Sequence, residues 1–476
     1  MSFNTADQHA PGAGDSTLSS GPSGAQATDN QAAQGATAGP FEVYFARLPL
    51  LDRDGMLCAY ETLPRIVAQE GDPADAPGGA GDANATTTSA AATLAPPSQA
   101  AALVKAFAKP ALRAALTGHP AWLDVTREML FDDALLRLPA DRVTFELPFD
   151  LGSDPEVIAR IVKLHGKRYR FALDNVTKAD ETLAKLLPYV DAIKIDIGDI
   201  AATMLPKFAS VLKAAGKLLV AMGVESKEDY ERVHALGFDR FQGYYFTQPH
   251  GGARRASASR QALLNLLQLL ASEPTVMQLE AELKLNPVLV MHLMRLANSS
   301  SFALGRKVTT LREAINATGT NRIARWTQLL LYADGRKISL EDDPMLQLAA
   351  TRARFMEMAA AVLPEAGPTE EDSAFLVGVF SFVDAVFGGP IEGALEVLRL
   401  AKPIRAAILR REGVLGQLLD ASEALERGNW IAVDAACAHL APLDAGAVSA
   451  LALQAAEWAG MAERDAEAQG LVQAEG

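Results

Sequence analysis

The sequence predicts an α/β plus all-α protein in which a TIM-like (β/α)8 barrel is followed by an all-helical domain. Two observations support this prediction. Between residues 41 and 250, short runs rich in β-branched and aromatic residues alternate with segments in which apolar residues have helical spacing. From residue 259 to about 466, β alternation disappears and helical spacing continues. Repeated strand and helix units form mostly parallel sheets, and their number here indicates a barrel.

The first half contains the candidate strands of the barrel. In chain order they are Phe41–Arg47, Leu57–Glu61, Trp122–Val125, Val143–Leu147, Arg170–Asp174, Ala192–Asp196, Leu218–Met222 and Arg240–Tyr244. Helical spacing between the later strands predicts the outer helices of the barrel. These are Pro155–Lys167, Lys178–Leu187, Pro206–Ala215 and Lys227–Leu236.

The second half consists of candidate helices only. They are Ala262–Leu270, Val276–Leu283, Pro287–Ala297, Leu311–Thr318, Arg322–Ala333, Pro344–Leu363, Glu370–Phe387, Ile391–Val397 and Pro403–Arg411. Apolar residues recur over enough of the chain to form an independent core. We therefore expect residues 259–466 to form a separate helical domain.

Composition sets the remaining boundaries. Residues 1–40 and 71–98 are poor in large apolar side chains, which predicts a disordered tail and a flexible insertion in the barrel over 41–250. Small residues over 251–258 indicate a linker. Residues 467–476 are expected to form a second tail.

Composition also excludes several classes of function. No segment approaches the roughly 18 apolar residues of a membrane span, and the N-terminus lacks a signal peptide, so we expect a cytoplasmic protein without a membrane partner. The formal charge of −14 opposes binding to nucleic acid. The two cysteines, Cys58 and Cys437, are far apart in sequence, which argues against a disulfide framework or a cysteine metal site.

Acidic residues lie at or near the ends of the predicted strands. They are Glu61, Asp124, Glu146, Asp174, Asp196 and Glu225. Isolated carboxylates after strands often cap helices. The C-terminal ends of barrel strands, however, meet at one mouth, where metals and phosphates are handled. Six such residues in one barrel make a shared site a better interpretation than separate caps.

These residues resemble the motifs of EAL-type cyclic di-GMP phosphodiesterases. The series of matches runs in order from residue 41 to about 250, which is more specific than any single motif. Glu61 to Arg65 resembles Glu-Ala-Leu-x-Arg, and Glu146 the first glutamate of Glu-x-x-Glu. Further matches are Asp174 to the first aspartate of Asp-Asp-Phe-Gly, Lys194 to the active-site lysine, Glu225 to the second glutamate of Ala-Glu-Gly-Val-Glu, and Gln242 to Gln-Gly-Tyr.

The resemblance implies a site for two divalent cations, and the sequence departs from that site. Asp124 replaces an asparagine ligand, Asn175 replaces the second aspartate, and Met222 replaces the catalytic glutamate. The thioether of Met222 cannot accept a proton from water or bind a hard metal ion. Phe149 also replaces a glutamate that steadies the active-site loop, and the loop over 176–181 has lost its glycines. Asp124 and Asn175 can also be interpreted as a compensating exchange that keeps one cation site.

The helical half resembles an HDOD domain, a relative of HD phosphohydrolases that lacks their His-Asp pair. The resemblance rests on residues 289–299, residues 308–315 and Arg325-Trp326. His292 and His439 are the only histidines of this half, and no His-Asp dipeptide occurs in the chain. We therefore expect no metal chemistry in residues 259–466.

Together these observations favour a bacterial EAL–HDOD signalling protein that is not an enzyme. In this hypothesis the chain is an inactive scaffold without a cofactor or metal, and residues 259–466 bind an unknown signalling protein. Glu61, Asp124, Glu146, Asp174, Asn175, Lys194, Met222 and Glu225 would be vestigial site positions. Two alternatives remain: a residual phosphodiesterase that uses Mg²⁺ or Mn²⁺, and a cyclic di-GMP receptor. In the receptor, Arg65 would hold phosphate and Gln242 would hold guanine.

Overall fold

The structure is a computed structural model that describes residues 41–69, 98–247 and 260–471, with gaps at 286–288, 291–292, 294–295, 298–307, 309, 332–341, 365–366, 388–389 and 398–399. The tail predicted over 1–40, nearly all of the insertion predicted over 71–98 and the predicted linker lie outside these residues. His292 and most of the helix predicted over Pro287–Ala297 also lie outside them.

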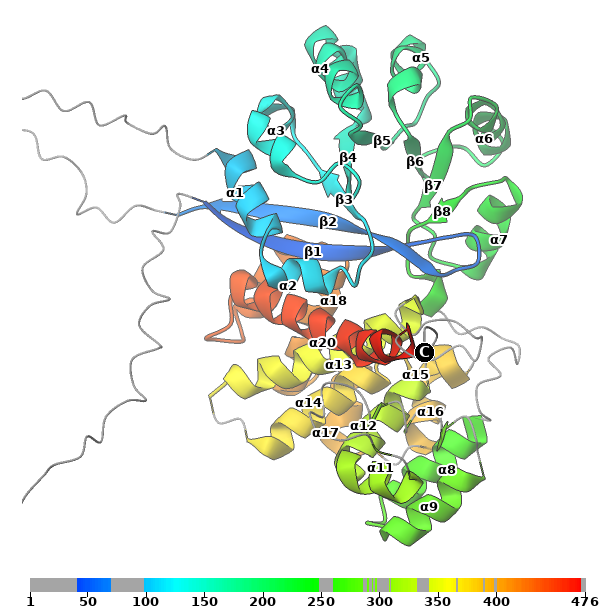
Figure 1. The fold of residues 1–476 in the computed structure, drawn as a ribbon, viewed down its shortest axis with the longest axis vertical. Helices are drawn as coiled ribbons and strands as arrows, with labels where there is room; N and C mark the ends of the chain where they lie inside the picture. Colours follow the sequence, from blue (N-terminus) through cyan, green and yellow to red (C-terminus); the bar gives the residue numbers. More distant parts are fainter. Residues whose placement is uncertain are drawn as a thin grey trace, which may run out of the picture. The chain divides into compact units, whose positions relative to one another are not determined.

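Eight strands close into a barrel in the order β1 to β8, which confirms the predicted fold class (Figure 1). The strands are β1 Phe41–Leu51, β2 Leu57–Ala68, β3 Ala121–Asp124, β4 Val143–Pro148, β5 Arg170–Asp174, β6 Ala192–Asp196, β7 Leu218–Met222 and β8 Arg240–Phe241. Strands β2 to β8 pair in parallel, whereas β1 is antiparallel to both β2 and β8. A tight turn after Leu51 causes this exception, because a parallel partner would need a longer crossover.

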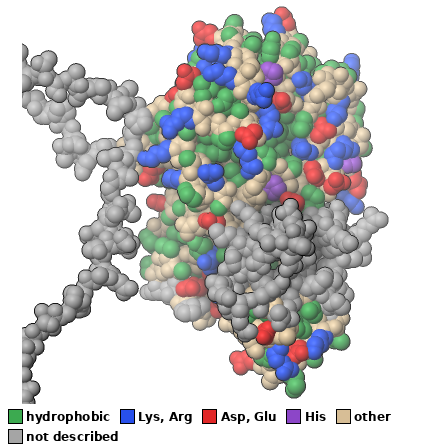
Figure 2. Space-filling view, in the orientation of Figure 1, with side chains coloured by type: hydrophobic (Ala, Val, Ile, Leu, Met, Phe, Trp, Pro, Cys, Tyr) green, Lys and Arg blue, Asp and Glu red, His purple; other side chains and the backbone are tan. Residues whose placement is uncertain are grey.

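Helices cover the outside of the barrel (Figure 1). They are α1 Gln99–Phe107, α2 Pro110–Ala115, α3 Arg127–Phe131, α4 Pro155–His165, α5 Glu181–Leu186, α6 Leu205–Ala214 and α7 Lys227–Ala235. Side-chain caps begin several of them: the Asp154 carboxylate accepts a hydrogen bond from the Glu156 amide, and the Ser226 hydroxyl accepts one from the Asp229 amide. On the face shown in Figure 2, basic and acidic side chains are interspersed over the barrel.

The alternation of side chains along each strand places the functional residues. One buried layer inside the barrel consists of Leu50, Ala59, Trp122, Ala172, Ala192 and Val220. The residue two positions later in a strand faces the same way and lies nearer the C-terminal mouth. The residues two positions beyond Ala59, Trp122, Ala172, Ala192 and Val220 are Glu61, Asp124, Asp174, Lys194 and Met222, respectively. An apolar layer therefore lies beneath a layer of residues that are polar except for Met222.

The described part of the second half contains helices and no strand, as predicted. Its helices are α8 Arg260–Leu270, α9 Val276–Lys284, α11 Leu311–Thr318, α12 Thr320–Leu330, α13 Pro344–Val362, α14 Pro368–Phe380, α15 Val383–Phe387, α16 Ile391–Val397, α17 Lys402–Arg410, α18 Gly413–Glu426, α19 Trp430–Cys437 and α20 Ala445–Leu471. The single helix predicted over Glu370–Phe387 is divided, because α14 ends at Phe380 and the Ser381 hydroxyl donates to the Gly378 carbonyl.

The last helices pack directly on the barrel. Ser449 of α20 accepts a hydrogen bond from the Phe45 amide at 2.9 Å and donates one to the Phe45 carbonyl at 3.0 Å. Leu63 of β2 lies against Gly428, where an added Cβ would come within 2.3 Å of its side chain. Buried residues of both halves belong to one hydrophobic cluster. No helix in the described ranges is long and apolar enough to cross a membrane.

Candidate functional site

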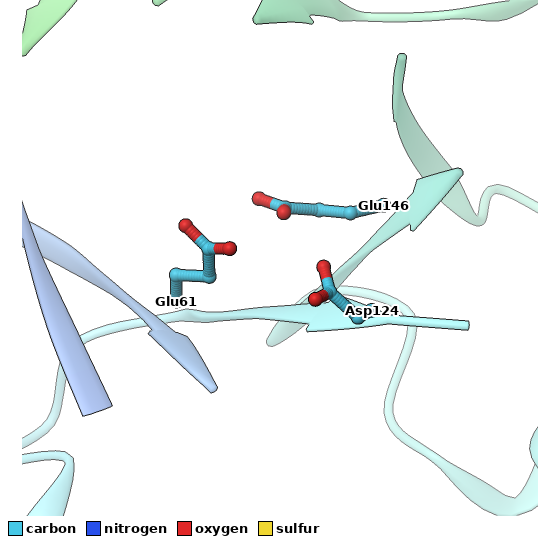
Figure 3. Close-up of side chains that lie close together, drawn as sticks. All are labelled: Glu61, Asp124 and Glu146. Carbon is cyan, nitrogen blue, oxygen red and sulfur yellow. The ribbon is translucent and has the colours of Figure 1, made fainter. Parts of the chain in front are cut away.

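Three carboxylates converge at the C-terminal mouth of the barrel. Glu61 comes from β2, Asp124 from the end of β3 and Glu146 from β4, and Figure 3 shows them turned toward one another. One oxygen of each lies within 4.8 Å of the others. Glu61 and Glu146 are buried, and Asp124 is half-buried. Three hard oxygen donors at this spacing are suitable ligands for Mg²⁺ or Mn²⁺.

Lys194 of β6 lies among these carboxylates. Its Nζ atom is 2.8 Å from Glu61 Oε2, 2.7 Å from Glu146 Oε2 and 3.6 Å from Asp174 Oδ1. The lysine side chain is only 1% exposed. One buried cation therefore faces several carboxylates in a low-dielectric environment, and no second cation is paired with Glu61, Asp124 or Glu146 among the described residues.

The electrostatics of the cluster reflect this shortage of positive charge. Burial, together with repulsion from Glu61, raises the pKa of Asp124 to about 6. Burial also raises the pKa of Glu146 well above its usual range. At Glu61, burial acts in the same direction, but attraction and hydrogen bonding by Lys194 outweigh it and lower the pKa. A second cation would favour the ionised form of all three carboxylates.

Unsatisfied oxygens provide a further test of whether the site suits a metal. Glu146 Oε1 is buried and accepts no hydrogen bond from a donor among the described residues, and Glu146 can bond the Asp124 carboxyl only while one of the two groups carries a proton. A buried carboxylate oxygen without a partner is costly, since it has lost its water without replacement. The charge, the spacing and this unpartnered oxygen all suit a divalent cation held by Glu61, Asp124 and Glu146.

The two residues predicted to bind the nucleotide have partners within the protein. The Gln242 side-chain amide donates a hydrogen bond to Glu61 Oε2, so Gln242 holds a carboxylate of the cluster. The Arg65 guanidinium pairs with Asp434 of α19 at 2.8 Å and lies 5.7 Å from the centre of the Trp430 ring. Arg65 is therefore engaged by the C-terminal helices.

The remaining predicted positions lie around the mouth and outside the three-carboxylate cluster. Asn175 follows β5 with a positive φ of 53° and is exposed. Met222 ends β7 in register with Asp196 of β6, and Glu225 is exposed on the following segment. Asp174 Oδ1 lies 3.6 Å from Lys194 Nζ, and the Asp174 side chain is 32% exposed. The departures at Asn175 and Met222 thus leave the cluster on β2, β3 and β4 intact.

Comparisons with known families agree with this geometry. The EAL domain family matches residues 31–249, and the HDOD domain family matches residues 259–383. The chain combines an EAL domain with an HDOD domain. Both predicted resemblances are therefore confirmed. Helices α16 to α20, several of which contact the barrel, lie beyond the HDOD match.

Two relatives share the sequence over much of its length. The uncharacterized protein YuxH of Bacillus subtilis is 24% identical over 401 residues, which cover 82% of this chain and 91% of YuxH. The cyclic di-GMP phosphodiesterase CdgJ of Vibrio cholerae is 26% identical over 317 residues, which cover 64% of this chain and 70% of CdgJ.

Solved structures show more distant similarity. A Klebsiella pneumoniae BlrP1 complex with calcium and cyclic di-GMP is 20% identical, with a TM-score of 0.31; the match covers 43% of this chain and 55% of BlrP1. The EAL domain of Mycobacterium smegmatis DcpA is 18% identical, with a TM-score of 0.30 and coverage of 43% and 91%.

The expectation that this chain is not an enzyme is wrong. The match to the EAL domain family and to a relative named as a phosphodiesterase points to an enzyme, and the acidic cluster fits a metal site. The expectation gave too much weight to Met222 and Asn175. The three clustered carboxylates come from other strands, and an aspartate at position 124 supplies the oxygen donor that an asparagine would supply.

Sequence reasoning missed the residues that connect the mouth to the C-terminal helices. Asp434 and Trp430 contact Arg65, and the Tyr244 hydroxyl donates to the carbonyl of Glu426. The only signal for Tyr244 was its place in the Gln-Gly-Tyr sequence. The protein partner predicted for residues 259–466 and the predicted cellular location stay predictions.

Proposed function

We propose that this chain hydrolyses cyclic di-GMP with the help of a divalent cation held by Glu61, Asp124 and Glu146. The observation that carries the proposal is the convergence of these carboxylates within 4.8 Å at the barrel mouth. The buried Glu146 oxygen that accepts no hydrogen bond among the described residues also supports it. The relative named as a cyclic di-GMP phosphodiesterase supports the choice of substrate.

In this proposal, neighbouring residues of the chain hold the metal-binding carboxylates in place. Lys194 donates to Glu61 and Glu146 and so fixes one oxygen of each carboxylate. Gln242 adds a second hydrogen bond to Glu61. Fixed ligands are important, because partners behind a metal ligand tune affinity and activity by about 10- to 100-fold. When bound, a divalent cation supplies the Lewis-acid chemistry that phosphodiester hydrolysis requires.

Met222 makes the proposed enzyme slow. A thioether cannot accept a proton, and a positioned general base contributes roughly 10²–10⁴ in rate. The cation-binding carboxylates and Lys194 are still present to stabilise negative charge. We therefore expect turnover that is low but dependent on the metal.

Incubation of the full chain with cyclic di-GMP tests the proposal. With Mn²⁺ or Mg²⁺ we expect slow conversion to the linear dinucleotide, and with EDTA we expect none. Glu61→Gln should abolish the conversion, because it removes a charged ligand while keeping the side-chain volume. The control is Glu156→Gln, which alters an exposed carboxylate paired with Arg127. Turnover that persists in Glu61→Gln, or its absence from the wild type, would contradict the proposal.

A further inference from the structure

A short segment after β8 connects the metal site with the C-terminal helices. At one end the Gln242 side chain donates to Glu61, and two residues later the Tyr244 hydroxyl donates to the Glu426 carbonyl at the end of α18. Burial raises the pKa of Tyr244 above its usual range, so its hydroxyl stays protonated and can donate. Gln242 thus donates a hydrogen bond to the proposed metal ligand Glu61, and Tyr244 donates one to the end of α18.

The backbone between these two side chains is held firmly. Gly243 has a φ of 144°, and an added Cβ there would lie 2.2 Å from the Val224 carbonyl oxygen. The Val224 amide donates to the Gln242 carbonyl at 3.1 Å, and the Tyr245 amide donates to the Val224 carbonyl at 3.1 Å. A displacement of Tyr244 is therefore transmitted to Gln242 instead of being absorbed between them.

The acceptor on α18 is also fixed. Arg352 of α13 is 3% exposed, and its Nε atom donates to Glu426 Oε1 at 2.8 Å. The same guanidinium donates to Glu423 at 3.1 Å and lies 3.7 Å from the centre of the Phe382 ring. Buried, multiply bonded charges of this kind hold a helix end in one place, because breaking the arrangement leaves an unpaired charge.

We propose that Tyr244 is a positioning residue through which the helical half orients the metal ligand Glu61. The connection runs from Glu426 through Tyr244 and Gln242 to Glu61, and it rests on the proposed function. Its anchor, α18, lies outside the residues that match the HDOD family. The metal affinity of the barrel therefore depends on the C-terminal helices, and a shift of α18 alters it.

Tyr244→Phe in the full chain tests this proposal, because it keeps the ring and removes only the donor. Calorimetric titration should show about threefold to tenfold weaker Mn²⁺ binding, the effect of losing one hydrogen bond behind a ligand. We also expect a lower kcat and an unchanged KM for cyclic di-GMP. The control is Tyr169→Phe, which removes a hydroxyl that donates to the Leu136 carbonyl at 2.8 Å on the outer side of the barrel. It should leave Mn²⁺ affinity unchanged.

The double variant that combines Tyr244→Phe with Gln242→Ala tests whether Tyr244 acts on Glu61 through Gln242. If Tyr244 acts through Gln242, then Tyr244→Phe should add no further loss of Mn²⁺ affinity to Gln242→Ala. Additive losses of Mn²⁺ affinity in the double variant would show that Tyr244 does not act through Gln242. Unchanged Mn²⁺ affinity in Tyr244→Phe would overturn the positioning role of Tyr244 and leave the proposed function standing. A wild type that fails to bind Mn²⁺ would instead contradict the proposed function, and this inference would fail with it.

Discussion

Replacement of Lys194 by methionine is expected to destabilise the barrel by about 3–5 kcal/mol, the cost of removing one partner from a buried charge group. Methionine has a similar length, so the loss reports on charge more than on packing. Without the lysine, Glu61 and Glu146 lose the donor that lies 2.8 and 2.7 Å away. Thermal unfolding of the full chain would measure the effect.

Added Mn²⁺ should recover more stability in Lys194→Met than in the wild type, because a bound cation replaces the missing charge. Lys213→Met is the matched control: its ion pair with Asp239 is at the surface, with the lysine side chain 39% exposed. That substitution should cost less than about 1 kcal/mol. A Lys194→Met chain as stable as the wild type would mean that the carboxylates are neutral without the lysine.

Met222→Glu is expected to increase kcat for cyclic di-GMP by about 10²-fold, the lower end of what a positioned general base contributes. Met222 follows the buried Val220 by two residues on β7, so the new carboxylate would face the barrel mouth beside Asp196. KM should change little, since the substitution adds a proton acceptor and removes no contact with the substrate.

Met222→Gln provides the comparison, because glutamine has the shape of glutamate but cannot accept the proton. We expect its kcat to match that of the wild type. Equal kcat values for the glutamate and glutamine variants would show that the proton acceptor lies elsewhere. Initial rates at saturating Mn²⁺ would distinguish these results.

Short runs rich in β-branched and aromatic residues predicted all eight strands of the barrel, because its parallel strands are buried on both faces. Such runs could not predict that β1 runs antiparallel to its neighbours, since their composition says nothing of strand direction. The division of the helix predicted over Glu370–Phe387 was also missed. Residues 374–380 are almost continuously apolar, so they carry little sign of where the helix ends.

The cluster of Glu61, Asp124 and Glu146 was predictable as a set of residues at strand ends, but the conclusion drawn from the motif departures, that the chain is not an enzyme, was wrong. A motif comparison weighs each departure equally, whereas the three clustered carboxylates come from β2, β3 and β4, and Asn175 and Met222 come from the ends of β5 and β7. Contacts between distant parts of the chain were not predictable. Arg65 meets Asp434, and Tyr244 meets Glu426, across 369 and 182 sequence positions.

Direct titration of the full chain with Mn²⁺, compared with Glu146→Gln, tests whether the carboxylate cluster is a metal centre. Glutamine keeps the volume of this fully buried side chain and removes its charge. The wild type should bind Mn²⁺ at a site that Glu146→Gln abolishes. Without metal the thermal unfolding midpoints should stay close, because losing the unfavourable burial of this carboxylate and its repulsion from Glu61 and Asp124 offsets the loss of its ion pair with Lys194. Equal Mn²⁺ affinity in the two proteins, or no binding by the wild type, would contradict a metal centre formed by Glu61, Asp124 and Glu146.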